Sequence, residues 1–262
     1  MSNNRSVWRF VPFIKASGQI QMAIDAWLLE QHRQGKYPPT LRFYAWEPVA
    51  ISLGYHQRRW PESWHHLTWR GEPIELVRRP TGGRAVLHQG DLTYAVVTSG
   101  LSQRRIEAYR TLCQFLIEGW RKLGFELSYG SAGRGYIHNS NCFETATGAD
   151  LVLPDGFKLI GSAQLRREQT VLQHGSIRLE PDPDLHQLVF GQGFYPSMIE
   201  RFSGESEDEG LTQSSQVQKL VMRALIEAAC QCFNIEFKLE PLSYYEWQAI
   251  QAYSVKFSVL KT

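Results

Sequence analysis

Residues 78–88 read RRPTGGRAVLH, with two adjacent glycines between a basic dipeptide and a short apolar run. Strand-like residues 74–78 lead into the glycines, and residues 85–87 continue from them as a second strand candidate. Because glycine has no Cβ, the backbone here can lie close against a ligand and expose its amides. An isolated Gly-Gly pair is equally an ordinary turn between two strands, with the arginines in solvent. The stretch therefore predicts sheet structure and a candidate binding loop.

On the N-terminal side of these glycines, apolar residues recur at helical spacing between Ile20 and Leu28. The spacing predicts a helix over about residues 19–33, which ends before Pro38. Two β-like runs follow at residues 41–46 and 49–53, separated by a Glu-Pro dipeptide. These runs predict a hairpin or two adjacent strands.

On the C-terminal side, residues 92–97 form another strand candidate after a turn over residues 88–91. Apolar residues from Ile106 to Leu123 then trace one face of a long helix, and Gly124 supplies its stop. Residues 129–141 are rich in Gly, Ser and Asn and lack apolar periodicity. We therefore expect a loop there, which delivers Cys142.

Beyond that loop, residues 154–156 read PDG between two short apolar runs, which is a hairpin signal. Residues 171–179 alternate like a strand, and residues 217–228 have the spacing of a helix. Ser243 and Glu246 have the S-x-x-E form of a capping box that opens a last helix.

Helices and hairpin-forming strands are thus mixed along the chain. This mixture favours an α/β (α+β) fold with a mixed, largely antiparallel sheet flanked by helices over a doubly wound parallel sheet. With 262 residues, we expect one catalytic domain over residues 1–262. Within it, the acidic stretch 203–215 is predicted to be a solvated loop before the C-terminal helices.

The composition is that of an ordinary globular protein, with 43% hydrophobic and 21% charged residues. The net charge is only +2, from 28 basic and 26 acidic residues. This balance does not indicate nucleic acid or an anionic membrane as a partner. No run approaches the ~18 consecutive apolar residues of a membrane span, and the N-terminus has no apolar signal-peptide core. We therefore expect a cytoplasmic protein that binds neither nucleic acid nor membrane, with its cysteines as thiols.

Two side chains are candidates for covalent chemistry. Lys158 lies in a short apolar strand just after the PDG turn, where a lysine facing a pocket would favour a nearby thiolate over a thiol. Cys142 has polar neighbours in a loop, whereas Cys113 falls on the apolar face of the predicted long helix. Taken alone, an exposed strand lysine and an incidental loop thiol are the commoner cases. The C-x-C pair Cys230 and Cys232 has no second pair, so no metal site is expected.

In this order, the glycine stretch and residues 156–164 (GFKLIGSAQ) resemble the lipoate–protein ligase A and octanoyltransferase family, whose hallmarks are RRxTGGxAVxH and GxKxxGSAQ. The resemblance covers about residues 8–190. It implies a biotin/lipoate ligase-like core, with the acyl chain in a tunnel beside the Gly-Gly segment. Further matches are MAID at 22–25, LRFY at 41–44, SLGY at 52–55 and QHGS at 173–176.

Within that family, ATP-using ligases adenylate free lipoate, whereas transferases pass the acyl chain through a cysteine thioester. Arg84 stands where ligases typically carry a third glycine, and TGGRAVLH resembles the LipM-type octanoyltransferases. Cys142 falls where their nucleophile is expected, although residues 143–150 depart from the Pro-Ser usual after it. Only about 70 residues follow the matched region, too few for the extra C-terminal domain of larger ligases and the final core helices together.

The resemblance implies an octanoyltransferase without cofactor, which moves an octanoyl group from octanoyl-acyl carrier protein to a lysine of a lipoyl-domain protein. The implied acceptors include the glycine cleavage H protein and the E2 subunit of 2-oxoacid dehydrogenases. Cys142 would carry the acyl thioester, and Lys158 would lower its pKa. The alternatives are an ATP-dependent lipoate–protein ligase, a lipoyl amidotransferase and an inert binding protein. The implied substrate-binding residues are Arg78, Thr81, Gly82, Gly83, Arg84, His88, Gly161, Ser162 and Ala163.

Overall fold

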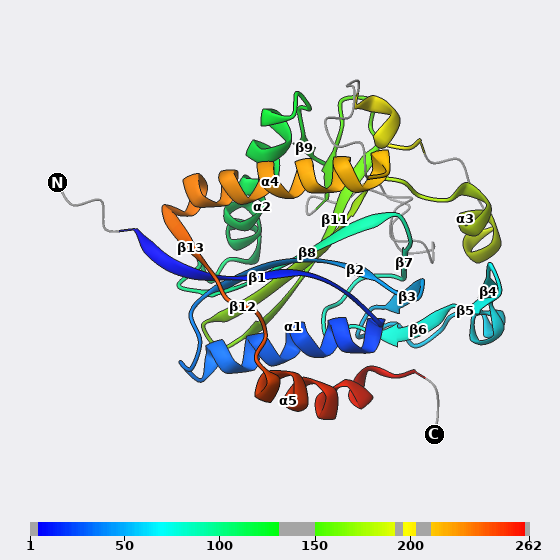
Figure 1. The fold of residues 1–262 in the computed structure, drawn as a ribbon, viewed down its shortest axis with the longest axis horizontal. Coiled ribbons are helices and arrows are strands. Elements are labelled where there is room, and N and C mark those ends of the chain that lie inside the picture. Colours follow the sequence, from blue (N-terminus) through cyan, green and yellow to red (C-terminus); the bar gives the residue numbers. More distant parts are fainter. Residues whose placement is uncertain (1–4, 131–149, 192–195, 203–210, 260–262) are drawn as a thin grey trace.

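The computed structural model describes residues 5–130, 150–191, 196–202 and 211–259, and its centre is an eight-stranded sheet (Figure 1). Neighbouring strands at one end of this sheet come from the two ends of the chain. In spatial order the strands are β13 (Ile235–Leu239), β1 (Ser6–Ala16), β2 (Thr40–Trp46), β8 (Asp91–Ser99), β12 (Thr170–Arg178), β11 (Lys158–Arg167), β10 (Leu151–Val152) and β9 (Ser128–Tyr129).

The pairing of these strands is mixed. β1 is parallel to both β13 and β2, whereas every other pair of neighbours, from β2–β8 to β10–β9, is antiparallel. The predicted mixed, largely antiparallel sheet is therefore confirmed. The PDG hairpin is also confirmed, because β10 and β11 pair on either side of it.

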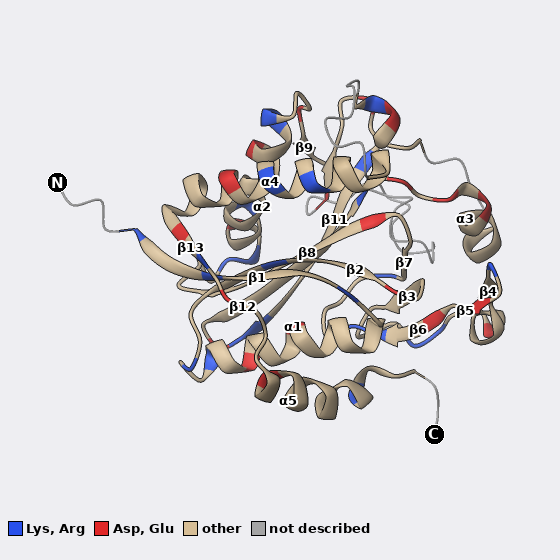
Figure 2. Cartoon of the chain, viewed as in Figure 1, with Lys and Arg blue, Asp and Glu red and all other residues tan. Residues whose placement is uncertain are grey.

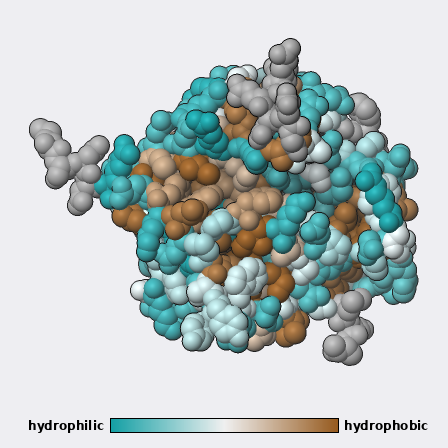
Figure 3. Space-filling view, in the orientation of Figure 1, coloured by the Kyte–Doolittle hydropathy of each residue, from teal (hydrophilic) through white to brown (hydrophobic). Residues whose placement is uncertain are grey.

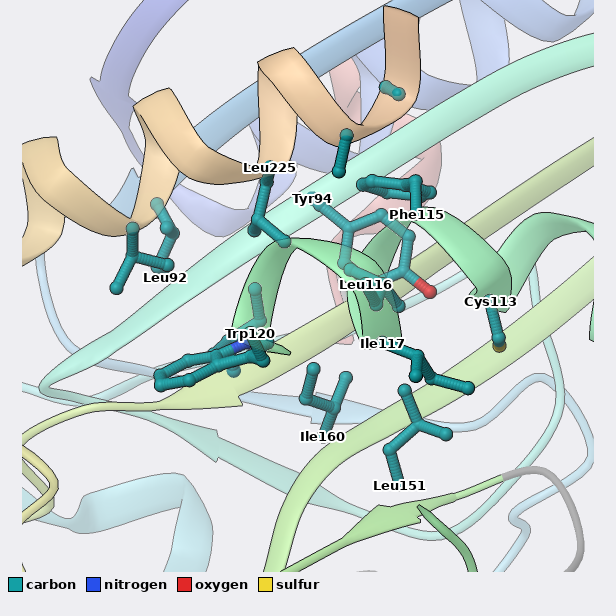
Figure 4. Packing of buried hydrophobic residues seen from close by; sticks show 14 of the residues in the cluster. Leu92, Tyr94, Cys113, Phe115, Leu116, Ile117, Trp120, Leu151, Ile160 and Leu225 are labelled. Carbon is teal, nitrogen blue, oxygen red and sulfur yellow. The ribbon is translucent and has the colours of Figure 1, made fainter. Parts of the chain in front are cut away.

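Helices cover both faces of the sheet. α2 (Arg105–Lys122) and α4 (Gln213–Phe233) lie on one face, and α1 (Gly18–Arg33) and α5 (Tyr244–Ser254) lie on the other (Figure 1). α1 packs on the sheet and α5 packs on α1, whereas α2 and α4 pack together on the other face, so that the protein has a separate hydrophobic core on each side. Figure 4 shows the first core, where Leu225 of α4 reaches toward Leu116 and Trp120 of α2.

The helix ends follow their local sequence signals. The Ser17 side chain caps α1, and the Glu75 carboxylate of a neighbouring strand accepts hydrogen bonds from the first two helical amides. Gly124 follows α2 with a φ of +85°, the left-handed conformation that glycine adopts without strain. The predicted capping box of Ser243 and Glu246 is present at the start of α5. The predictions for Gly124 and for the capping box held because both signals involve residues close in sequence.

A smaller unit lies beside the end of the large sheet (Figure 1). It contains a three-stranded sheet and a third hydrophobic cluster around the buried Trp64. Its elements are β3 (Ala50–Leu53), η1 (Glu62–His66), β4 (Thr68–Trp69), β5 (Glu72–Pro73), β6 (Glu75–Arg78), β7 (Val86–His88) and α3 (Pro183–Phe190). The remaining short helices are η2 (Ile199–Arg201) and η3 (Val255–Phe257).

Two predicted strand neighbourhoods differ in the structure. β2 and β3 do not form a hairpin, because β2 belongs to the large sheet and β3 pairs with β6 and β7. β7 and β8 are likewise split between the two sheets. The Glu-Pro step after β2 and the turn after β7 redirect the chain from one sheet to the other. A local turn signal cannot show which of these outcomes occurs, since the competing partners are distant in sequence.

Among the longer elements, β1, α3 and β13 were not predicted, and neither were the short elements β4, β5, β9, η1, η2 and η3. The predicted connector 203–215 also differs at its end, because Thr212 caps α4 and residues 213–215 are helical. Residues 203–210 of that connector lie outside the described residues.

The surface shows no single charged pole in the view of Figure 2, where basic and acidic segments occur in both helical layers. In Figure 3, hydrophilic residues cover much of this face, and hydrophobic residues are visible between the layers. Val7 on β1 and Leu239 on β13 are both exposed at the edge of the large sheet. No helix in the described part of the chain has the length and apolar character needed to cross a membrane.

Candidate active site

A cavity of about 280 Å³ lies where the glycine loop after β6 meets β11 and β12. Its wall also includes the aromatic rings of Tyr44 and Trp46, so it combines apolar surface with a few polar groups, as small-molecule sites do. Six predicted substrate-binding residues line it together, and they come from both sequence motifs: Gly82, Gly83, His88, Gly161, Ser162 and Ala163.

The other predicted residues lie behind or beside this wall. The Arg78 guanidinium donates to the carbonyls of Gly54 and Gln57, and the Arg84 carbonyl accepts a hydrogen bond from Arg79. Thr81 is buried and contacts a histidine from β12. These residues hold the glycine loop, so the structure places them as supports of the cavity and not in its lining.

Lys158 begins β11 and is almost fully buried. Its ammonium nitrogen lies 2.9 Å from a carboxylate oxygen of Asp150, and the two side chains are only 3% and 5% exposed. Asp150 lines the cavity, whereas Lys158 lies behind it. The Lys158 charge is therefore compensated by a carboxylate, a partner that the sequence did not predict.

A buried network joins the glycine loop to α1. The His174 Nδ1 lies 2.7 Å from the Asp25 carboxylate, and its Nε2 lies 2.6 Å from the Thr81 hydroxyl. Asp25 also binds the Arg42 guanidinium and the Tyr44 hydroxyl. Burial raises the pKa of Asp25, but Arg42 and His174 outweigh that effect and leave the pKa below its ordinary value. Asp25 is thus an ionised anchor that fixes His174, and through it Thr81.

A second network orients His88 in the cavity wall. Its ring stacks on Trp46, its Nδ1 lies 2.9 Å from Asp91, and its Nε2 lies 2.8 Å from the Ser52 hydroxyl. Burial lowers the pKa of His88, and the Asp91 carboxylate offsets only part of that effect. The imidazole is therefore neutral, with Nδ1–H donating to Asp91 and Nε2 accepting from Ser52.

Ser162 is held in position by a hydrogen-bond chain of buried residues. Its hydroxyl lies 2.7 Å from the Tyr94 hydroxyl, which accepts a hydrogen bond from the Gln173 amide. The same amide donates to the sulfur of Cys113 at 3.5 Å. Burial raises the pKa of Cys113 to about 12, although the Gln173 hydrogen bond lowers it slightly. Cys113 is therefore a thiol at neutral pH and no nucleophile, as its helical position predicted.

Two glycines allow the walls of the cavity to approach one another. A Cβ on Gly175 of β12 would lie 2.7 Å from the Gly161 carbonyl oxygen and from the Ser162 hydroxyl. A Cβ on Gly54 would lie only 1.8 Å from the carbonyl oxygen of Gly83. The glycines at 54 and 175 are thus needed for close backbone packing and not for a turn.

The predicted nucleophile, Cys142, lies outside the described residues. The site residues that sequence reasoning missed are the partners of the predicted ones and the residues that hold those partners: Asp25, Ser52, Asp91, Tyr94, Asp150, Gln173 and His174. Asp25, Ser52, Gln173 and His174 stood in segments that matched the family, and that match was the only signal available for them.

The fold is shared with solved structures of lipoate–protein ligases. A structure of lipoate–protein ligase A bound with ATP superposes with a TM-score of 0.70 at 23% identity, covering 95% of this chain and 94% of that one. A bipartite lipoate protein ligase from Thermoplasma acidophilum gives 0.68 at 21% identity, covering 96% and 93%.

The sequence places the chain within a family. The family model of the lipoyl protein ligase A/B catalytic domain matches residues 17–218, and the chain belongs to that family. It is 35% identical over 246 residues to octanoyltransferase LipM of Geobacillus kaustophilus, covering 89% of this chain and 86% of the relative. It is 40% identical over 188 residues to octanoyltransferase LipM of Kyrpidia tusciae, covering 68% of each. The predicted family resemblance is confirmed.

Proposed function

We propose that this protein is an octanoyltransferase, which moves an octanoyl group from a thioester donor to a lysine of a lipoyl-domain protein. The observation that carries the proposal is the cavity in which both glycine segments meet, in a chain 31–40% identical to octanoyltransferases of the LipM type. Its lining includes Met22, Trp46 and Val86, which offer apolar surface for an alkyl chain beside the polar groups. Cys142 is proposed as the acyl carrier on the enzyme, and acyl carrier protein as the donor.

In the first step, the Cys142 thiolate attacks the carbonyl carbon of the donor thioester. A carbon–sulfur bond to the enzyme forms, the bond to the donor sulfur breaks, and the donor leaves as a thiol after taking up one proton. Backbone amides around Gly82 and Gly83 are the proposed donors to the developing oxyanion. The buried pair of Lys158 and Asp150 supplies a fixed dipole beside the cavity.

In the second step, the neutral amine of the acceptor lysine attacks the enzyme thioester. An amide bond forms, the carbon–sulfur bond breaks, and the proton lost by the amine returns the cysteine to a thiol. One thioester replaces another in the first step and an amide replaces a thioester in the second, so neither step needs ATP. We propose a cytoplasmic reaction, which agrees with the free thiols of Cys113, Cys230 and Cys232.

The test is intact-mass measurement of the protein after incubation with octanoyl-acyl carrier protein and no nucleotide. One hydroxylamine-sensitive octanoyl adduct is expected on the wild type and on the control Cys230→Ser, and none on Cys142→Ser. Addition of a lipoyl domain should discharge the adduct onto the domain. Transfer of free octanoate by Cys142→Ala with ATP would overturn the proposal in favour of a ligase.

A further inference from the structure

A second concavity, of about 750 Å³, lies along α1 between the end of β11 and the C-terminal helices. We call it the basic groove, because among its described lining residues six are cationic and two, Glu30 and Glu168, are anionic. The excess of four positive charges is larger than the +2 of the whole chain. The six cationic residues are Arg33, Arg78, Arg79, Arg166, Arg167 and Lys256.

The charges of the basic groove are only partly neutralised. Arg33 contacts both carboxylates, at 2.7 Å to Glu30 and 2.8 Å to Glu168. The guanidinium groups of Arg78 and Arg166 donate instead to backbone carbonyls, which carry no net charge. A positive potential therefore remains along the groove, of the kind that attracts an acidic partner.

Two further cationic side chains lie at the exposed edge of the groove. Within the described part of the chain, Arg167 and Lys256 have no carboxylate partner within ion-pair distance, and both residues are exposed. Lys256 lies over the ring of Tyr253, a neutral contact that keeps its charge available. Charges in such rim positions act mainly on encounter and orientation of a partner.

The basic groove lies beside the cavity of the proposed active site. Arg79 lines both, and Pro80 of the groove directly precedes the loop of Thr81 to Gly83. On β11, Leu165 of the groove lies two residues from Ala163 of the cavity, and strand alternation places these two side chains on the same face of the sheet. The groove and the cavity therefore adjoin on that face.

We propose that the basic groove docks the acyl donor, an acidic carrier protein that holds its octanoyl group on a phosphate-containing arm. The inference rests on the proposed octanoyl transfer and adds to it the binding surface for the donor. Guanidinium groups match phosphate oxygens in both charge and geometry. The acceptor is a poorer match, because its own reacting group is a lysine and would meet like charges at Arg78 and Arg79.

The experiment compares two octanoyl donors, octanoyl-acyl carrier protein and octanoyl-pantetheine, which lacks both the phosphate and the protein. The double variant Arg167→Glu/Lys256→Glu should raise the KM for the carrier-bound donor about tenfold. Its KM for octanoyl-pantetheine, its kcat and its KM for the lipoyl domain should stay unchanged. Arg223→Glu, an exposed arginine on α4 in the other helical layer, is the matched control and should behave as wild type.

Binding of fluorescent octanoyl-acyl carrier protein, followed by anisotropy, tests the docking separately from the chemistry. Weaker binding by the double variant, with a reduced salt dependence, is the expected result. An unchanged affinity, or a rise in KM confined to the lipoyl domain, would overturn the docking proposal and leave octanoyl transfer intact. Absence of an octanoyl adduct on the wild type would instead contradict the proposed function, while the anisotropy would still report on the groove.

Discussion

Lys158 and Asp150 form a buried ion pair at the edge of the cavity, and this changes the role expected for the lysine. A lone buried ammonium would act as a free positive charge, whereas a compensated one acts as an oriented hydrogen-bond donor. Asp150 is therefore a positioning residue for Lys158. Since Asp150 lines the cavity, the pair also connects the substrate pocket to the interior of the sheet.

Loss of either partner should leave a buried charge without compensation. We expect Asp150→Leu and Lys158→Met each to lower the free energy of unfolding by about 3 kcal/mol. The double variant Asp150→Leu/Lys158→Met should recover part of that loss, because no charge is then buried. Urea unfolding of the four proteins measures the coupling, and additive single effects would show that the pair has no energetic significance.

Gly54 provides a second test at this scale, because its hydrogen faces the carbonyl oxygen of Gly83. Gly54→Ala places a methyl group where only 1.8 Å separates it from that oxygen, so the glycine loop must move. We expect a lower Tm and at least a tenfold loss of octanoyl transfer, since a small displacement of a binding loop has large kinetic effects. Gly82→Ala is the control for stability, because no atom lies within 4 Å of its added Cβ. Equal Tm values for the two variants would contradict this account.

At the scale of elements, the site depends on contacts between a helix and distant strands. α1 supplies Asp25, β2 supplies Arg42 and Tyr44, and β12 supplies His174, which reaches the glycine loop. α3 does not take part in these polar contacts. It packs against the rest of the smaller unit through Leu185 and Val189, and its His186 is buried. This short helix belongs to the smaller unit, and its histidine makes the attachment sensitive to pH.

Burial, together with the nearby positive charge of Arg178, lowers the pKa of His186 to about 4. The folded value thus lies below the ordinary value of 6.5. The neutral ring contributes fully to the free energy of unfolding above pH 6.5. This contribution decreases as the pH falls and is lost below about pH 4. For the wild type, the free energy of unfolding lost over this pH range is on the order of 3 kcal/mol.

We therefore expect His186→Gln to flatten the decline in unfolding free energy between pH 7 and pH 4, because glutamine cannot take up the proton. Chemical denaturation at a series of pH values is the measurement. His66→Gln, at an exposed position of the same smaller unit, is the control and should keep the wild-type slope. Identical slopes for all three proteins would refute the assignment to His186.

At the scale of the whole molecule, one sheet separates two hydrophobic cores that have no helix in common. Leu225 of α4 and Ile250 of α5 are both fully buried, on opposite faces. We propose that both cores belong to one cooperative domain. Leu225→Ala and Ile250→Ala should then each lower the free energy of unfolding by about 3 kcal/mol. Each variant should unfold in a single transition at lower denaturant, with an unchanged denaturant slope. Two separate transitions in either variant would show that the faces unfold independently.

Local patterns were sufficient for the helices α1, α2 and α5, for the PDG hairpin and for the family, because caps, turns and motif spacing involve residues close in sequence. They also placed Gly82, Gly83 and the segment from Gly161 to Ala163 in one site, through the resemblance. The N-terminal strand β1 was missed, since it is held by the distant strands β2 and β13.

Only the folded chain decides which charges meet. Asp150 beside Lys158, Asp25 beside His174, and the basic groove beside the cavity all arise where segments far apart in sequence converge. Sequence patterns carry the period of a helix or strand but not its tertiary neighbours. The energetics of a buried charge depend almost entirely on those neighbours. Motifs by themselves thus predicted the class of chemistry, whereas the carboxylate beside Lys158 and the groove beside the cavity are decided by the tertiary structure.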